Sequence, residues 1–342
     1  MKRLQLTILL VAMALSARAL AADPLLLKIS HLYTPLSPLQ VRVFQPWCET
    51  LEKESAGRMK CQIYPSMQLG GAPSQLVDQV KNGVADVVWT VAGLTPGRFP
   101  ALEALELPFV ISDGLGSARG AWEYQQKFAT KELDGFKLLA IHTDGGTLFH
   151  FGDKNITDLA GLKGTKIRAS NRMSTKTISA LGATPVALPP TQITEAVAKG
   201  VVDGVMSTWE LVIPLKLDDV TKFHLEPPAG KPTFGGTVLI MLMNKQRYQN
   251  LPPDLRAIID KNSGPALVDA LGRVWDDGIN DVRKKIAASS ATTTVVSERE
   301  YEAMRKAASV VEKDWIQEVT AKGFNGAAMA AAAHTMAGRT AK

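Results

Sequence analysis

Short apolar runs alternate with segments of helical periodicity through most of this chain. Leu25 to His31 and Met59 to Tyr64 are compact apolar runs typical of strands, and the apolar positions from Leu39 to Glu54 recur at helical spacing. Phe136 to Thr143 and Thr237 to Met243 are two further apolar runs. Strands separated by helices favour an α/β fold with largely parallel sheets.

Two segments rich in glycine and proline interrupt this order. The first is Asp144-Gly145-Gly146-Thr147, and the second runs from Glu226 to Gly236, just before a strongly apolar strand. One joint before and one after a middle segment indicate that the chain crosses twice between two lobes. Such an arrangement makes a hinge with a ligand cleft between the lobes.

A weak internal echo also favours two similar lobes. Residues 82–90 and 199–207 share the order helix end, Gly, short turn, Asp and strand. We expect lobe I to contain residues 22–145 and 233–270, and lobe II to contain residues 146–232 and 271–330. The Ala-rich residues 331–342 are expected to form a disordered tail. Residues 101–110 are expected to add a further strand-like segment.

The first residues have the three parts of a secretory signal peptide. Lys2 and Arg3 precede an apolar run from Leu4 to Leu15, and Ala19 and Ala21 form a small-residue cleavage site. We therefore expect residues 1–21 to be removed and the mature protein to be soluble in the periplasm. The formal charge of +6 includes three cations of this leader, and no basic run follows, so a nucleic-acid partner is not expected.

The chain has two cysteines, Cys48 in a predicted helix and Cys61 in the strand that follows. In an oxidising compartment they can pair, but the sequence does not show whether their Cα atoms lie close enough, so both states stay open.

Motifs for chemistry are weak. The glycines at 114, 116 and 120 approach a dinucleotide fingerprint, but the third is one residue late and Asp113 would face the pyrophosphate. The five histidines lack the close spacings of a zinc site. We therefore expect no cofactor, no metal and no catalytic residue.

Arg168 is the strongest candidate for a binding residue. It lies at the end of a predicted strand from Thr165 to Ala169, and the Ser170-Asn171 pair that follows can cap a helix beginning near Ser174. A guanidinium group meets a carboxylate with two parallel hydrogen bonds, so this position suits a small organic anion. The alternative is an arginine that merely ends an exposed strand.

Several aromatic and polar residues fall where a cleft would lie. Trp89 and Trp209 lie at the ends of the two echoed segments, His150 follows the first joint, and Phe109 ends an apolar segment. They can line a ligand pocket, or they can pack inside their own lobes.

Four segments in order make the chain resemble the extracytoplasmic solute-binding proteins of TRAP transporters, the DctP family. They are the leader, MQLGGAPSQLVDQVKNGVADVVWT, LKGTKIR and LGATPVALPPTQITEAVAKGVVDG. The resemblance implies a periplasmic-binding-protein-like fold, with two α/β lobes joined by hinge strands and a long helix. It implies that Arg168 binds the ligand's carboxylate and that Trp209 forms a pocket wall, with Glu210 beside it. It also implies TRAP membrane subunits as partners, and no enzymatic activity.

The departures from the family's sialic-acid branch bear on the ligand. That branch carries an arginine where this chain has Thr147-Leu148-Phe149, an aromatic at Pro190 and an asparagine near Ser207. A monomer that binds an aromatic or branched 2-oxo or 2-hydroxy acid is the interpretation we favour. A C4-dicarboxylate ligand, and a secreted hydrolase or lyase using Glu210 or Asp203, stay as alternatives. The expected ligand-binding residues are Arg168, Trp209, Trp89, His150, Phe109, Tyr33, Gly70 and Glu210.

Overall fold

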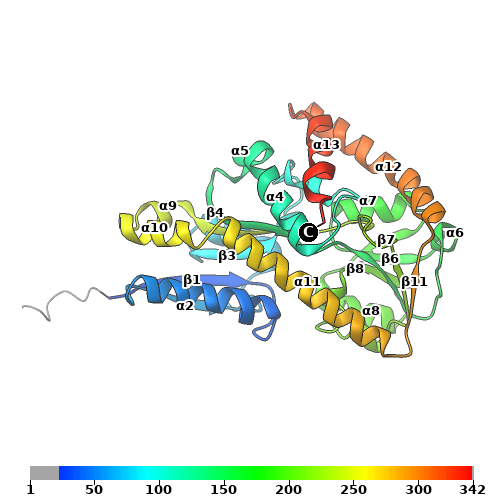
Figure 1. Cartoon of the computed structure of the whole chain (residues 1–342), viewed down its shortest axis with the longest axis horizontal. Coiled ribbons are helices and arrows are strands. Elements are labelled where there is room, and N and C mark those ends of the chain that lie inside the picture. The colour runs from blue at the N-terminus through cyan, green and yellow to red at the C-terminus, as the bar shows by residue number, and fades with distance from the viewer. Residues whose placement is uncertain (1–22, 341–342) are drawn as a thin grey trace, which may run out of the picture.

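The computed structural model describes residues 23–340 and shows two β-sheets, each flanked by helices (Figure 1). The expected signal peptide, residues 1–21, lies outside the described residues. Among residues 23–340, no helix has both the length and the apolar character that crossing a membrane requires.

The sheet of lobe I has five strands in the order β2-β1-β3-β10-β4. β1 runs parallel to β2 and β3, whereas β10 is antiparallel to both of its neighbours. The strands are β1 (Leu25–His31), β2 (Met59–Tyr64), β3 (Val87–Val91), β4 (Phe136–Thr143) and β10 (Val238–Asn244). The helices that contribute apolar residues to the cores of lobe I are α2 (Gln45–Glu54), α3 (Leu76–Lys81), α4 (Gly114–Phe128), α5 (Thr130–Leu133), α9 (Lys245–Gln249) and α10 (Pro253–Lys261).

The sheet of lobe II has six strands in the order β11-β9-β5-β8-β6-β7. Here β5 is antiparallel to both neighbours, and the remaining pairs are parallel. The strands are β5 (Leu148–Phe151), β6 (Lys166–Ala169), β7 (Thr184–Ala187), β8 (Gly204–Ser207), β9 (Phe223–Glu226) and β11 (Thr292–Val295), and the helices are α6 (Leu159–Leu162), α7 (Arg172–Ala180) and α8 (Ile193–Ala198).

The two antiparallel strands are those that the chain enters after crossing between the lobes. β4 leads across to β5, and β9 leads back to β10. The two crossing segments pair with each other: the Thr147 amide donates to the Gly235 carbonyl at 2.9 Å, and the Phe234 amide donates to the Thr147 carbonyl at 3.1 Å. The two joints that the sequence predicts separately therefore form one two-stranded hinge.

Two long helices also span the lobes. In α11 (Pro265–Ala287), Leu271 and Trp275 pack in the core of lobe I, while Val282 and Ile286 pack in the core of lobe II. α12 (Glu298–Ala321) likewise contributes apolar residues to both cores. Figure 1 shows both as long diagonal helices. The predicted fold, two α/β lobes joined by hinge strands and a long helix, is confirmed.

The internal echo has a structural counterpart in the two lobes. Asp86 accepts a hydrogen bond from the Lys28 amide at 2.8 Å, and Asp203 accepts one from the Lys166 amide at 2.7 Å. In each lobe the aspartate lies just before one strand and joins it to the parallel strand beside it: β3 to β1 in lobe I, and β8 to β6 in lobe II. Asp203 also pairs with Lys154 at 2.9 Å. It has this structural role at the beginning of β8, at the opposite end from Ser207 and Glu210.

Cys48 and Cys61 form a disulfide, with their Cα atoms 5.7 Å apart, so the question that the sequence left open is answered. The bridge joins α2 to β2.

Two expectations about local structure are wrong. Residues 331–337 belong to helix α13 (Gly326–Ala337), whose Ala330, Ala333 and Ala337 are buried against lobe I. The Ala-rich sequence suggested fraying, but small side chains let this helix approach α4 closely. Residues 102–106 form a buried 3₁₀ turn and not a strand.

Gly120 is the residue that permits the close approach of α4 and α13, because a Cβ there would overlap the backbone of Met336. Gly120→Ala should lower the free energy of unfolding by about 1–3 kcal/mol, as overpacking does elsewhere. A Cβ added at Gly135 would meet nothing within 4 Å, so Gly135→Ala is the matched control and should change stability by less than about 0.5 kcal/mol. Urea unfolding measures both, and equal stabilities of the two variants would contradict the proposed packing.

A candidate carboxylate site between the lobes

Arg168 is positioned by β6 and by the helix that follows. Ile167 and Ala169 face the core of lobe II, so the side chain between them points to the other face of the sheet. Asn171 caps α7, accepting the Ser174 amide at 2.7 Å. The cap that the sequence predicts is therefore present, and it fixes the chain direction directly after Arg168.

The guanidinium of Arg168 is buried and has no acidic partner. The residue is 4% exposed, and its Nε–H donates to the Leu188 carbonyl at 3.0 Å. Among residues 23–340, no carboxylate forms an ion pair with it. Burial lowers the pKa of Arg168 to about 10, so it still carries its charge at neutral pH. A buried charge without a counterion is costly, and an anionic ligand would neutralise it.

Arg168 and two acids act on one buried phenol, that of Tyr33. Burial raises the pKa of the Tyr33 phenol, the charges of Glu210 and Asp144 raise it further, and Arg168 opposes them. Tyr33 follows β1 in lobe I, Asp144 begins the hinge, and Arg168 and Glu210 belong to lobe II. The site therefore combines groups from both lobes and from the hinge.

The two acids are held differently. Asp144 accepts the Gly146 amide at 3.0 Å and the Thr237 amide at 3.1 Å, which ties the two crossing segments together. Its pKa is nevertheless raised to about 6 by burial. Glu210 is 4% exposed, and its Oε2 has no hydrogen-bond partner among the described residues. Burial, and then the Asp144 charge, raise the pKa of Glu210 to about 7.

Unsatisfied hydroxyls gather at the same ends of the strands. Thr143 ends β4, Thr147 precedes β5 and Ser207 ends β8, and each has a buried hydroxyl with no partner within residues 23–340. Buried polar groups are normally hydrogen-bonded, so several unsatisfied ones beside the hinge are typical of a site that receives a polar ligand. The sequence patterns did not point to these residues or to Asp144 as ligand-binding groups. One signal was present, an aspartate before two glycines at the end of a strand.

Trp89 supports the site from behind. Its indole Nε1–H donates to His142 Nε2 at 2.9 Å, and its ring packs edge-on against Tyr33 with the ring centres 4.9 Å apart. Trp89 is fully buried in lobe I and so fixes the ring of Tyr33.

Trp209 and His150 lie together inside lobe II. The Trp209 indole donates to Glu226, which also forms an ion pair with Arg283 at 2.6 Å. His150 packs edge-on against Trp209, with the ring centres 4.9 Å apart, and its Nδ1 lies 2.8 Å from Nδ1 of His224. These side chains anchor the turn that carries Glu210.

The structure does not bring Phe109 or Gly70 to this group. Phe109 packs on Tyr301 with ring centres 5.3 Å apart and lines a separate cavity of about 430 Å³ beside α12 and α13. Gly70 lies in an exposed loop, where its carbonyl accepts a hydrogen bond from Gln79 at 2.8 Å.

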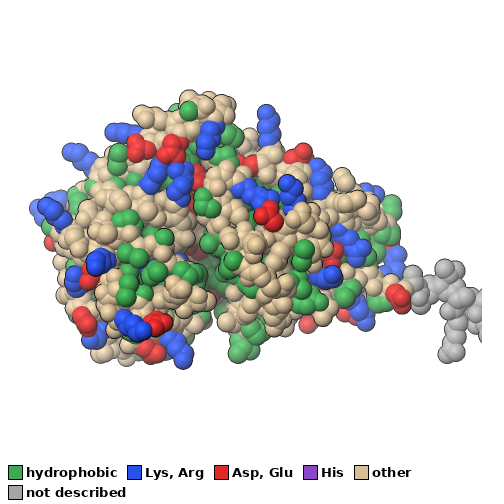
Figure 2. Space-filling model, turned by 180° about the vertical axis from the view of Figure 1, so that it is seen from behind, with side chains coloured by type: hydrophobic (Ala, Val, Ile, Leu, Met, Phe, Trp, Pro, Cys, Tyr) green, Lys and Arg blue, Asp and Glu red, His purple; other side chains and the backbone are tan. Residues whose placement is uncertain are grey.

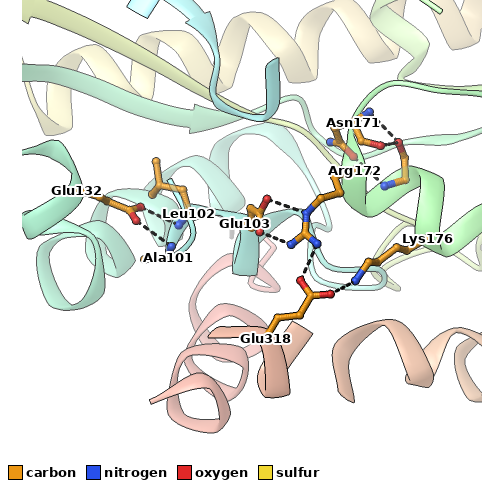
Figure 3. Close-up of polar contacts among 9 residues, drawn as sticks. Ala101, Leu102, Glu103, Glu132, Asn171, Arg172, Lys176 and Glu318 are labelled. Carbon is orange, nitrogen blue, oxygen red and sulfur yellow. Dashed lines mark hydrogen bonds and ion pairs between the residues drawn. The ribbon is translucent and has the colours of Figure 1, made fainter. Parts of the chain in front are cut away.

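A second arginine nearby is already neutralised. Arg172, the first residue of α7, forms a two-point ion pair with Glu103 in lobe I and a third contact with Glu318 of α12, which Lys176 also reaches (Figure 3). These acids hold the pKa of Arg172 above its ordinary value. The contrast leaves Arg168 as the cation available to a ligand in this part of the structure.

Seen from behind, the surface is hollowed between the two halves, and charges of both signs are mixed across the surrounding face (Figure 2). The fold, the hinge and a buried, uncompensated cation between two lobes together define a binding protein for small anions.

The comparison with known families agrees. Residues 29–318 match the family model DctP, bacterial extracellular solute-binding protein, family 7, and the chain belongs to this family. The predicted family is thereby confirmed. Proteins of this family in TRAP systems bind small organic acids and work with TRAP membrane subunits in the periplasm; they are transport proteins and not enzymes. The hydrolase or lyase alternative is therefore set aside.

Three solved structures illustrate the similarity. A TRAP solute-binding protein from Rhodoferax ferrireducens in complex with copurified benzoate is 38% identical, with a TM-score of 0.87 over 92% of this chain and 97% of that chain. A marine metagenome protein specific for aromatic acid ligands, in complex with metahydroxyphenylacetate, is 36% identical, with a TM-score of 0.88 over 92% and 98%. A Bordetella bronchiseptica protein with bound mandelate is 25% identical, with a TM-score of 0.84 over 92% and 99%.

The raised pKa of Glu210 predicts a pH dependence of stability. The folded chain holds this proton up to about pH 7, whereas the ordinary pKa is 4.5, so the free energy of unfolding should fall as the pH rises through this window. A glutamine does not titrate, so over this window the free energy of unfolding of Glu210→Gln should fall by up to roughly 3 kcal/mol less than that of the parent protein.

Urea unfolding of both proteins at pH 5 and pH 7.5, without ligand, measures this difference. The control is Glu195→Gln, because Glu195 pairs with Lys199 on the surface and should leave the parent's pH dependence unchanged. Parallel pH profiles for Glu210→Gln and the parent would show that Glu210 titrates normally.

Proposed function

We propose that this protein captures an aromatic monocarboxylic acid between its two lobes and delivers it to the membrane subunits of a TRAP transporter. The observation that carries the proposal is Arg168, a buried guanidinium in the cleft that has no protein counterion within residues 23–340. The ligand's carboxylate takes that place with two charge-assisted hydrogen bonds.

The charge pattern around Arg168 favours one carboxylate over two. A C4-dicarboxylate needs a second cation, but Arg172 is neutralised by Glu103 and Glu318. Of the charged groups that act on Tyr33, Arg168 is the cation, whereas Glu210 and Asp144 are acids and offer a second carboxylate no positive charge.

The aromatic part of the proposal is supported by Tyr33 and by the similar proteins. Tyr33 faces Arg168, and Trp89 holds its ring in place. Three solved structures that are 25–38% identical to this chain hold benzoate, metahydroxyphenylacetate or mandelate. An aromatic acid gains from stacking and from apolar burial between the lobes.

Ligand capture follows from the hinge. The paired crossing segments let the lobes close on the acid, so that groups from both lobes surround it. One chain supplies both lobes, and we expect a monomer to be the active form. Export through the signal peptide at residues 1–21 would place it in the periplasm.

A panel of acids tests the ligand class. Benzoate, mandelate and phenylglyoxylate should raise the melting temperature, because a ligand at about 100 times its dissociation constant stabilises by about 2.7 kcal/mol. Succinate, malate and fumarate at the same concentrations should not. A thermal-shift assay of purified, refolded protein gives the answer, and the opposite ranking would establish a dicarboxylate ligand.

The role of Arg168 predicts a large loss of affinity. Breaking a buried ion pair typically costs about 3–5 kcal/mol, so Arg168→Ala should weaken binding of the best aromatic acid by more than about a hundredfold. Arg168→Lys should not restore it, because an ammonium group is not a planar fork. Calorimetry measures the affinity of both variants for this acid.

Arg119→Ala is the matched control, since Arg119 is half-exposed and pairs with Asp269 on the surface. It should bind like the parent. Near-native affinity in either Arg168 variant would show that Arg168 does not bind the ligand's carboxylate.

A further inference from the structure

Glu210 has the features of a group that waits for a hydrogen-bond donor. It is 4% exposed, no cation pairs with it among the described residues, and its Oε2 has no hydrogen-bond partner there. Leaving a buried acceptor unsatisfied costs stability, and native proteins seldom do so without a reason.

The side chain is also held in place. A Cβ at Gly278 of α11 would lie 2.9 Å from Cγ of Glu210, so the missing side chain of Gly278 makes room for the stem of the glutamate. On the other side, Trp209 is anchored to Glu226 and His150. The carboxyl group is therefore positioned by α11 and by the turn after β8, and its electrostatic neighbours are Tyr33 and Asp144.

Arg168 and Glu210, which both act on the Tyr33 phenol, differ in their hydrogen-bonding chemistry. Arg168 offers donors to a carboxylate, whereas Glu210 offers an acceptor. The unsatisfied hydroxyls of Ser207 and Thr147 lie at the ends of neighbouring strands and can form further hydrogen bonds. A plain aromatic ring bound at Arg168 would leave the Glu210 acceptor unsatisfied, while a ring with a hydroxyl group would satisfy it.

We propose that Glu210 is a specificity-determining residue, which accepts a hydrogen bond from a hydroxyl group on the ligand's ring and so makes hydroxylated aromatic acids the preferred ligands. The proposal rests on the proposed function, because it assumes that the ligand's carboxylate is held by Arg168. A hydrogen bond to a charged group favours the hydroxylated acid by about ten- to a hundredfold over the same acid without the hydroxyl.

Calorimetry with benzoate, 3-hydroxybenzoate, 4-hydroxybenzoate and 3-hydroxyphenylacetate tests the proposal. The parent protein should bind at least one hydroxylated acid about tenfold or more tighter than benzoate. Glu210→Leu should bring the ratio of the hydroxylated acid's affinity to that of benzoate down to about one. Glu210→Gln keeps an acceptor oxygen and should retain most of the preference.

The melting temperature without ligand separates this role from a structural one. If Glu210 serves the ligand, Glu210→Leu should raise the melting temperature at pH 7.5, because it removes an unsatisfied buried acid. A lowered melting temperature with an unchanged preference would overturn the proposal.

The remaining outcomes are distinguishable. Equal affinities of the parent for benzoate and for every hydroxylated acid would overturn the specificity role and leave the aromatic ligand class standing. Failure of all four acids to bind, with another acid bound in their place, would overturn both.

Discussion

The uncompensated charge of Arg168 is the constraint on which the rest of the site depends. A guanidinium that is 4% exposed keeps its charge, and the protein supplies it with one carbonyl and no carboxylate among the described residues. The nearby acids are not used to neutralise it. Glu103 and Glu318 are occupied by Arg172, and burial raises the pKa of Glu210 and Asp144, which favours their neutral forms. The fold therefore carries an electrostatic cost that a bound anion removes.

The hinge connects this site to both lobes. Asp144 accepts amides from both crossing segments, so the strand that leaves lobe I and the strand that returns to it are joined beside the cleft. Gly146 has a φ of 94° and lies against Thr233, which leaves no space for a side chain. The hinge is thus specified by backbone conformation, and a ligand bound beside it lies next to the segments about which the lobes close.

Several residues that look functional in the sequence are structural supports. Within lobe II, Trp209 is hydrogen-bonded to Glu226 and His150 to His224. In lobe I, Trp89 is hydrogen-bonded to His142. They act on the site through their neighbours: Trp89 fixes Tyr33, and Trp209 anchors the turn that carries Glu210. The polar network of Trp209, Glu226 and Arg283 is satisfied, whereas the acceptor of Glu210 is not. This difference separates groups that stabilise the fold from the group that we propose to serve the ligand.

The α/β alternation, both joints, the cap after Arg168 and the family could all be predicted from the amino-acid sequence. These features depend on local periodicity, on turn chemistry and on short motifs, which neighbouring residues specify. Arg168 could be singled out because a strand end beside a helix start is a local arrangement. The helix at residues 326–337 could not be predicted, because its stability comes from its contact with Gly120, which is distant in the sequence.

Which polar groups lie together depends on the tertiary structure alone. Tyr33, Asp144 and Glu210 come from distant parts of the chain, and burial, which sets their pKa values, is a property of the folded lobes. Arg168 and Arg172 lie four residues apart, the first in β6 and the second at the start of α7. Contacts with Glu103 and Glu318 neutralise Arg172 and leave Arg168 without a counterion. Only folding brings those two acids to α7.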